Sequence, residues 1–194
     1  MKVMVIVMVN EGKQFEKDFT NSIPAYCYCH RLRDSTQSFY KAQETSYSWD
    51  NECDFFVFNN TSQFFYAIEC KSTKSRSMSF QRNKEDAKKR PNQMIKYHQV
   101  ESLTKMSKYN HIKAGLLLNF RDDKNDMQRT YWIDIRNYNN LIANTTKSSI
   151  NEIDIIKYNA IKLIGQKKRV HYKWDIENLF ITLESDANKK GRCI

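Results

Sequence analysis

Two acidic residues and a lysine stand where a pair of adjacent strands would bring them together. Asp54 opens an apolar, aromatic run, and Glu69 and Lys71 close a second one. Carboxylates hold Mg²⁺ in proteins, and the bound ion neutralises charge on a phosphate and lowers the pKa of a water. A lysine beside them can polarise the attacking water or stabilise the transition state. These residue types predict metal-dependent hydrolysis of a phosphodiester.

The same spacing has a structural alternative, because an Asp followed at a distance by Glu-x-Lys occurs by chance in many chains. The surroundings of the two carboxylates favour the catalytic interpretation. Both lie in strongly apolar runs, where an unpaired charge is costly to bury and a cation is a natural partner. We therefore keep Asp54 and Glu69 as candidate metal ligands and Lys71 as a candidate catalytic residue.

A β-hairpin is the element that must position these residues. The runs 53–58 and 63–70 are rich in aromatic and β-branched residues, and the Asn-Asn-Thr-Ser segment between them suits a turn. Side chains alternate along a strand, so Glu69 and Lys71 point to the same face. The antiparallel partner folds back and places Asp54 near residues 68–70.

The remaining pattern predicts one α/β domain, a mixed β-sheet flanked by helices, because 194 residues suffice for one well-filled core. Residues 1–10 are a leader or an edge strand, 11–183 the domain and 184–194 a C-terminal tail. Apolar periodicity and breaker residues give the other expected elements. They are helices at 11–22, 92–109, about 149–156 (capped by Ser149 and Glu152, with Ile153 and Ile156 inside) and 175–183; strands at 26–32, 112–120, 130–135, 160–164 and 170–173; and loops at 34–51 and 72–90, the latter basic and mobile.

A net charge of +10 makes nucleic acid the first partner to consider, since a positive field attracts polyanions and releases their counterions. A membrane surface is the rival, but the chain shows no amphipathic basic helix, and the apolar run 3–9 is too short to span a bilayer. Five cysteines without paired CxxC spacing give little support to zinc or disulfides. We expect a reducing cytoplasm and no membrane.

The positive charge is concentrated after the candidate lysine, where residues 71–96 contain nine Lys or Arg and two acidic residues. A charge run is usually a solvated face, yet one beside an active site is well placed to follow a phosphate backbone. No base-reading motif is present, which favours recognition by shape. The candidate DNA-binding residues are Arg31, Arg33, Lys74, Arg76, Arg82, Lys88, Lys89, Arg90, Lys167, Lys168 and Arg169.

The hairpin also resembles a known family. Cys-Asp-Phe-Phe-Val-Phe at 53–58, followed by Ala-Ile-Glu-Cys-Lys-Ser at 67–72, is similar to the core of the PD-(D/E)xK nucleases, with Cys53 in place of the initial Pro. Within that superfamily the chain resembles Holliday junction resolvases of the RecU type, including phage-encoded relatives. Residues 12–19 resemble an opening helix whose glutamate, here Glu16, reaches the metal site. Residues 98–103 resemble a helix with a Gln, here Gln99, near the catalytic Lys.

This resemblance, which covers roughly residues 11–183, implies a restriction-endonuclease-like fold and a Mg²⁺-dependent endodeoxyribonuclease, with Mn²⁺ as the alternative ion. It implies a homodimer that resolves four-way junctions in branched DNA by paired symmetric nicks, in recombination and repair, in a bacterial or phage-infected cytoplasm. The segment 72–97 is longer than the resemblance leads one to expect. Two alternatives stay open: a restriction-like or end-processing nuclease of the same fold, and a basic DNA-binding module without activity.

Overall fold

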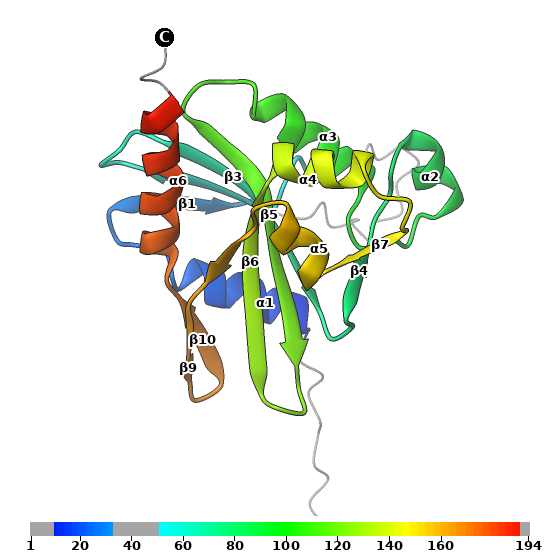
Figure 1. Cartoon of the computed structure of the whole chain (residues 1–194). Helices are drawn as coiled ribbons and strands as arrows, with labels where there is room; N and C mark the ends of the chain where they lie inside the picture. The colour runs from blue at the N-terminus through cyan, green and yellow to red at the C-terminus, as the bar shows by residue number, and fades with distance from the viewer. Residues whose placement is uncertain (1–9, 33–50, 191–194) are drawn as a thin grey trace, which may run out of the picture.

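The computed structural model describes residues 10–32 and 51–190, with side chains through Ser185. Within these residues a six-stranded mixed sheet has the order β1-β2-β3-β5-β6-β8 (Figure 1). Strands β3 and β5 are parallel and the other neighbours are antiparallel. The bounds are β1 Cys27–Arg31, β2 Phe55–Asn59, β3 Phe65–Thr73, β5 Ile112–Asp122, β6 Met127–Asp134 and β8 Ile161–Leu163; two small sheets pair β4 Ser77–Ser79 with β7 Ser149–Asn151, and β9 Gly165–Lys168 with β10 His171–Trp174.

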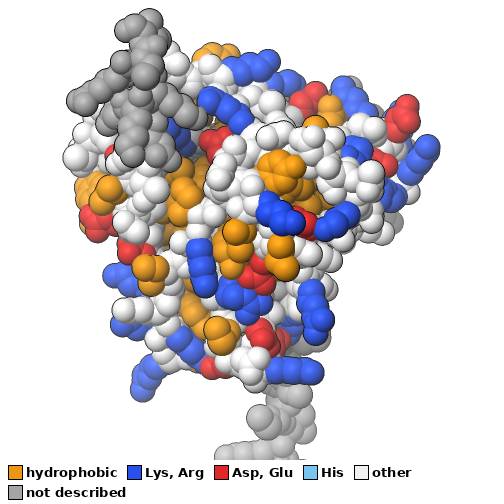
Figure 2. Space-filling model, viewed as in Figure 1, with side chains coloured by type: hydrophobic (Ala, Val, Ile, Leu, Met, Phe, Trp, Pro, Cys, Tyr) orange, Lys and Arg blue, Asp and Glu red, His pale blue; other side chains and the backbone are white. Residues whose placement is uncertain are grey.

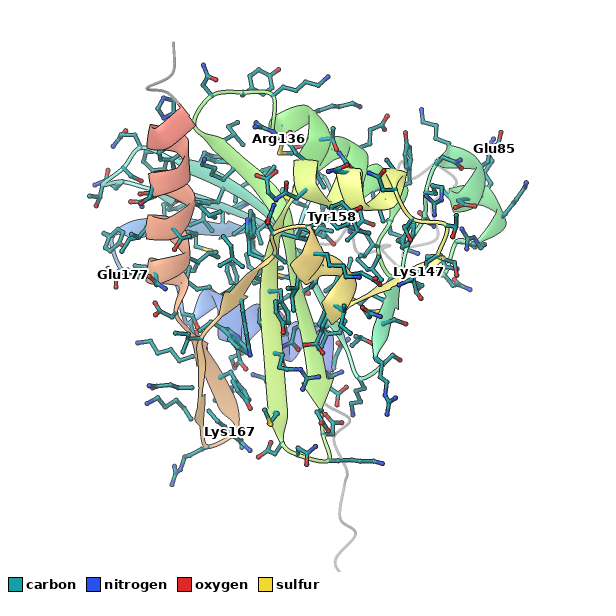
Figure 3. The ribbon with its side chains drawn as sticks, in the orientation of Figure 1. Glu85, Arg136, Lys147, Tyr158, Lys167 and Glu177 are labelled. Atoms are coloured by element: carbon teal, nitrogen blue, oxygen red, sulfur yellow. The ribbon has the colours of Figure 1, made fainter. Side chains whose placement is uncertain are left out.

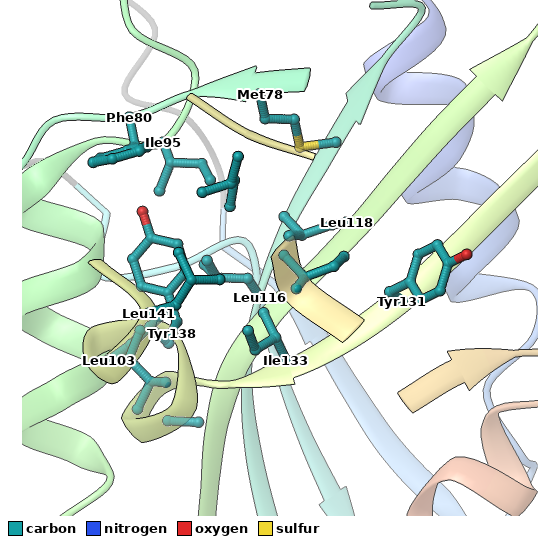
Figure 4. Close-up of a cluster of buried hydrophobic side chains, with 14 of the residues drawn as sticks. Met78, Phe80, Ile95, Leu103, Leu116, Leu118, Tyr131, Ile133, Tyr138 and Leu141 are labelled. Carbon is teal, nitrogen blue, oxygen red and sulfur yellow. The ribbon is translucent and has the colours of Figure 1, made fainter. Parts of the chain in front are cut away.

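Helices cover both faces of the large sheet, as the sequence predicted. They are α1 Glu11–Thr20, α2 Lys84–Lys89, α3 Tyr97–Met106, α4 Ile135–Ala143, α5 Glu152–Lys157 and α6 Ile176–Lys190. Helices α1 and α6 enclose one apolar core with β2 and β3. Helices α3, α4 and α5 enclose a second core on the opposite face, where Figure 4 shows Phe80 and Ile95 side by side near Tyr138. Alternation along β3 divides its side chains between the two cores, with Ile68 in the first and Ala67 in the second.

Strand β5 contains the longest unbroken run of buried residues in the sheet. Its residues from Ala114 to Phe120 are all buried, as predicted for an apolar run covered on both faces. Gly115 lies on this strand, and a Cβ atom there would lie 2.5 Å from the carbonyl oxygen of Ile133. The close approach of β6 to β5 therefore requires glycine at this position.

The helix and the hairpin expected around the candidate site are confirmed. Asn10 caps α1 by accepting a hydrogen bond from the Lys13 backbone N–H, and α1 ends at Thr20, before the breaker Pro24. Strands β2 and β3 pair from Phe55 opposite Ile68 to Phe58 opposite Phe65. The turn between them is longer than expected and extends through Phe64, so β3 begins at Phe65 instead of residue 63.

The prediction of a mobile loop over 72–90 is wrong. Strand β3 continues to Thr73, and β4 and α2 follow. Met78 and Phe80 are fully buried and hold this basic segment against the core of α3 and α4. Phe80 also forms a β-bridge with Ile95, which delays the start of α3 to Tyr97 instead of residue 92. Two apolar side chains outweigh the many cations because burial, not composition, determines order here.

The C-terminal half contains further corrections. Strand β6 ends at Asp134, whose side chain caps α4, a helix that the sequence analysis missed. The capping box of α5 is formed by Asn151 and Asp154, so Ile155 is buried while Ile153 and Ile156 are exposed. Strand β9 was also missed.

The expected boundary between domain and tail at residue 183 falls inside α6. This helix continues to Lys190, and Glu184 accepts hydrogen bonds from the side chains of Asn59, Ser62 and Tyr66 on the hairpin. The expected leader up to residue 9, the loop 34–50 and residues 191–194 lie outside the described residues. No helix in the described part of the chain is long and apolar enough to cross a membrane.

Candidate active site

The candidate site lies in a notch of the large sheet. Strand β2 begins at Phe55, but β3 continues past it, so residues 69–73 of β3 pair with β5 on one side only. Asp54 immediately precedes β2, and its backbone N–H donates to the carbonyl of Ile68 at 3.2 Å. The Asp54 carboxylate in turn accepts a 2.7 Å hydrogen bond from the backbone N–H of Cys70. Asp54 is therefore held over β3 at the start of β2.

Glu69 is the buried centre of the notch, with no exposed surface. Its Oε1 accepts hydrogen bonds from Lys71 Nζ and from Gln99 Nε2, each at 2.5 Å. Its Oε2 is buried and has no hydrogen-bond donor among the described residues. The hairpin thus brings Asp54, Glu69 and Lys71 together as the spacing predicted, and α3 adds Gln99 from the face that Glu69 and Lys71 share.

Gln99 has a defined orientation because both ends of its amide are engaged. Its Oε1 accepts from the backbone N–H of Lys96 at 3.3 Å, within the N-terminal cap of α3, which leaves Nε2 to donate to Glu69. The side chain therefore couples the start of α3 to the buried carboxyl. In this structure Gln99 positions Glu69.

The carboxyls of Asp54 and Glu69 are close enough to influence each other's pKa. Burial raises the pKa of Glu69 to about 8; Lys71 opposes this rise, and Asp54 adds to it. Burial also raises the pKa of Asp54. For Lys71, burial lowers the pKa, but Glu69 and Asp54 outweigh it and leave the pKa raised. Near neutral pH the site therefore contains a charged lysine and a protonated glutamic acid.

This arrangement fits a cation held by two carboxylates. The Oε2 atom of Glu69 is buried without a donor, and two carboxylates buried side by side are unfavourable as anions unless a positive partner joins them. Among residues 10–32 and 51–185, however, no group of three or more His, Cys, Asp or Glu side chains is arranged to hold a metal ion. The protein side chains fit a magnesium ion that keeps several waters or substrate oxygens as its other ligands.

Glu16 lies beside the notch but is engaged by an arginine. Its Oε2 accepts from Arg31 Nε at 2.7 Å and lies 2.6 Å from Arg31 Nη2. Arg31 is on β1, next to Asp54, because the Leu32 backbone N–H donates to the Asp54 carbonyl at 2.9 Å. The positive charge of Arg31 also opposes the burial that raises the pKa of Asp54. The predicted third carboxylate is therefore adjacent to the pair but does not join it in this structure.

The candidate DNA-binding residues fall into two groups. Some are held within the protein: Arg31 pairs with Glu16, Lys74 with Glu11 and Asp123, Arg90 with Asp86, Lys167 with Asp126, and Arg82 donates to the backbone carbonyls of Ile142 and Lys147. The others with described side chains are exposed: Arg76, Lys88, Lys89, Lys168 and Arg169. Arg33 lies outside the described residues.

The cations are also dispersed in space. Figure 2 shows Lys and Arg side chains spread over the viewed face, interleaved with acidic and apolar ones. Figure 3 places Lys167 on the β9–β10 hairpin, far from Lys147 and from the Glu85 region of α2. On the viewed face the Lys and Arg side chains therefore do not form one continuous basic surface.

The sequence analysis missed a groove on α1. It has a volume of about 340 Å³ and is lined by Lys13, Glu16, Lys17, Thr20, Asn21 and Arg31. Four of these residues follow the helical spacing i, i+3, i+4 and i+7, which was the available signal in the sequence. The apolar periodicity of α1 marks only its opposite, buried face.

Comparison with known proteins finds similarity to a protein of prophage origin. No protein-family model matches the chain. The chain is 26% identical over 179 residues to the SPbeta prophage-derived uncharacterized protein YotM of Bacillus subtilis (strain 168), covering 88% of this chain and 85% of that protein. The chain is thus similar over most of its length to a protein of prophage origin.

Proposed function

We propose that this protein is a divalent-metal-dependent DNA endonuclease with a restriction-endonuclease-like fold. The observation that carries the proposal is the buried Glu69 carboxyl, which has Lys71 and Gln99 on one oxygen, no donor on the other, and Asp54 beside it. A structural ion pair needs only one partner for the carboxylate. A second buried carboxyl is unfavourable unless a cation joins the pair.

Each residue then has a separate role. Asp54 and Glu69 would hold Mg²⁺, or Mn²⁺, which supplies a Lewis acid and a water of lowered pKa. Lys71 would stabilise negative charge on the phosphate that is attacked, and Gln99 keeps Glu69 oriented. Glu16 would join the metal ligands when Arg31 turns from it to a phosphate.

We further propose that the substrate is branched DNA, in particular the four-way junction, cut by a homodimer. The resemblance of the hairpin, α1 and α3 to RecU-type resolvases supports this, as does the net charge of +10. The similarity to a prophage-derived protein agrees with a phage-encoded branch. A dimer with two-fold symmetry would supply two equivalent sites for the two cuts that a junction needs.

The test is incubation of the native protein with Mg²⁺ and labelled four-way junction, linear duplex and flap DNA. Paired symmetric nicks in the junction alone are expected. Glu69→Gln and Lys71→Ala should each lower the rate by about a hundredfold or more. Glu152→Gln is the matched control, because Glu152 pairs with Arg129 outside the notch. Cutting of linear duplex at an equal rate would instead support a restriction-like or end-processing nuclease.

A DNA-binding module without activity is the second candidate. It is favoured by the lack of a third side-chain metal ligand in the part of the chain that the structure describes. Tight DNA binding by the native protein with no cutting in Mg²⁺ or Mn²⁺ would establish this candidate and refute the nuclease.

A further inference from the structure

The α1–β1 groove presents a helix face of unusual composition. Lys13, Glu16, Lys17 and Thr20 share one side of α1, while Phe15 and Phe19 bury the other side in the core. Arg31 lines the groove from β1. The groove therefore contains three cations and one carboxylate.

The two lysines are the available cations of this groove. Glu16 is engaged by Arg31, whereas Lys13 and Lys17 are exposed and have no ion-pair partner among the described residues. In the basic segment after the candidate site, by contrast, Lys74 is held between two carboxylates, although Arg76, Lys88 and Lys89 are exposed. Cations that are already paired gain less from a phosphate, since they must first give up a partner.

The groove adjoins the notch through β1. Glu16 and Arg31, which form an ion pair, both line the groove, and the chain that follows Arg31 is joined to Asp54 by the backbone hydrogen bond from Leu32. A strand whose phosphate lies at the notch can thus extend directly along α1.

We propose that the α1–β1 groove binds the phosphate backbone of the DNA strand that enters the notch, with Lys13 and Lys17 contacting two nearby phosphates. This inference rests on the proposed function. The two lysines are about 6 Å apart along the helix axis, and phosphates of one strand recur every 3.4 Å or so along duplex DNA. Flexible lysine side chains can bridge this difference.

The test is the salt dependence of DNA binding, measured by fluorescence anisotropy with labelled duplex and four-way junction in EDTA, so that no cleavage competes. Each phosphate contact contributes about 0.9 to the log–log slope. Lys13→Ala/Lys17→Ala should therefore reduce the slope by about 1.8. Lys13→Arg/Lys17→Arg should keep it. Lys124→Ala/Lys157→Ala is the control, since it removes the same charge from exposed lysines outside the groove.

An equal reduction in the control, or none in the groove variant, would overturn the proposal. Circular dichroism and thermal unfolding check that each variant is folded, and Lys13→Gln/Lys17→Gln is a second neutral version. The proposed nuclease activity is tested separately. If the groove variant shows the predicted slope but the native protein does not cut DNA, the groove is supported as a DNA-binding site and the nuclease proposal is refuted. If the native protein cuts DNA but the slope of the groove variant is unchanged, only the proposal for the groove is refuted.

Discussion

Replacement of Glu69 by Gln should stabilise the metal-free protein, because Gln is neutral and similar in shape to the protonated carboxyl. Burial raises the pKa of Glu69 from 4.5 to about 8. Between these values the unfolded chain loses the proton while the folded protein keeps it, so stability falls as pH rises and levels off above the folded pKa. At about pH 7 the difference corresponds to about 3 kcal/mol.

The assay is urea unfolding in EDTA, followed by tryptophan fluorescence from about pH 5 to 8. The native protein should lose stability across this range through Glu69, and Glu69→Gln should remove that loss. The melting temperature of the variant should be higher by roughly 6 to 12 °C at about pH 7. Glu152→Gln is the matched control and should destabilise, because Arg129 and Tyr131 donate to Glu152 and help to lower its pKa against burial.

Divalent cations should reverse the order of stability, so that the native protein becomes more stable than Glu69→Gln. Binding requires the deprotonated carboxylate, so Ca²⁺ or Mg²⁺ should stabilise the native protein by more at higher pH and leave Glu69→Gln unchanged. If Glu69→Gln destabilises the metal-free protein, or if the native protein gains stability through Glu69 between about pH 5 and 8, the carboxyl is an ordinary ion-pair partner of Lys71 and the reasoning fails.

Three further results are expected. Gly115→Ala should lower the free energy of unfolding by more than about 2 kcal/mol, because its Cβ would meet the β6 backbone. Gly12→Ala on α1 has room and should be neutral or stabilising. Urea unfolding compares the two variants, and equal effects would contradict the close approach of β6 to β5. Arg82→Ala should cost about 1–3 kcal/mol in unfolding free energy but leave the salt slope of DNA binding unchanged, because Arg82 donates to two backbone carbonyls. A lower slope would instead identify Arg82 as a phosphate contact. Gln99→Ala should weaken binding of Ca²⁺ about tenfold or more in calorimetry, and an unchanged affinity would remove Gln99 from the site.

The hairpin was predictable because its rules are local. An Asn-rich turn between two aromatic runs specifies antiparallel pairing, and period-two alternation places Glu69 and Lys71 on one face whatever the rest of the chain does. The same local rules gave α1 and the buried strand β5. They failed for 72–90, because the burial of Met78 and Phe80 depends on helices later in the chain.

The sequence by itself determined the three residues at the notch, since a few torsion angles and one turn suffice to bring Asp54 to β3. Only the tertiary structure decided which cations are available and which carboxyls have a raised pKa. Arg82 donates hydrogen bonds to two backbone carbonyls, and Arg31 forms an ion pair with Glu16, which therefore does not join Asp54 and Glu69. Burial and pairing depend on every element packed around a residue, and no spacing along the chain encodes them.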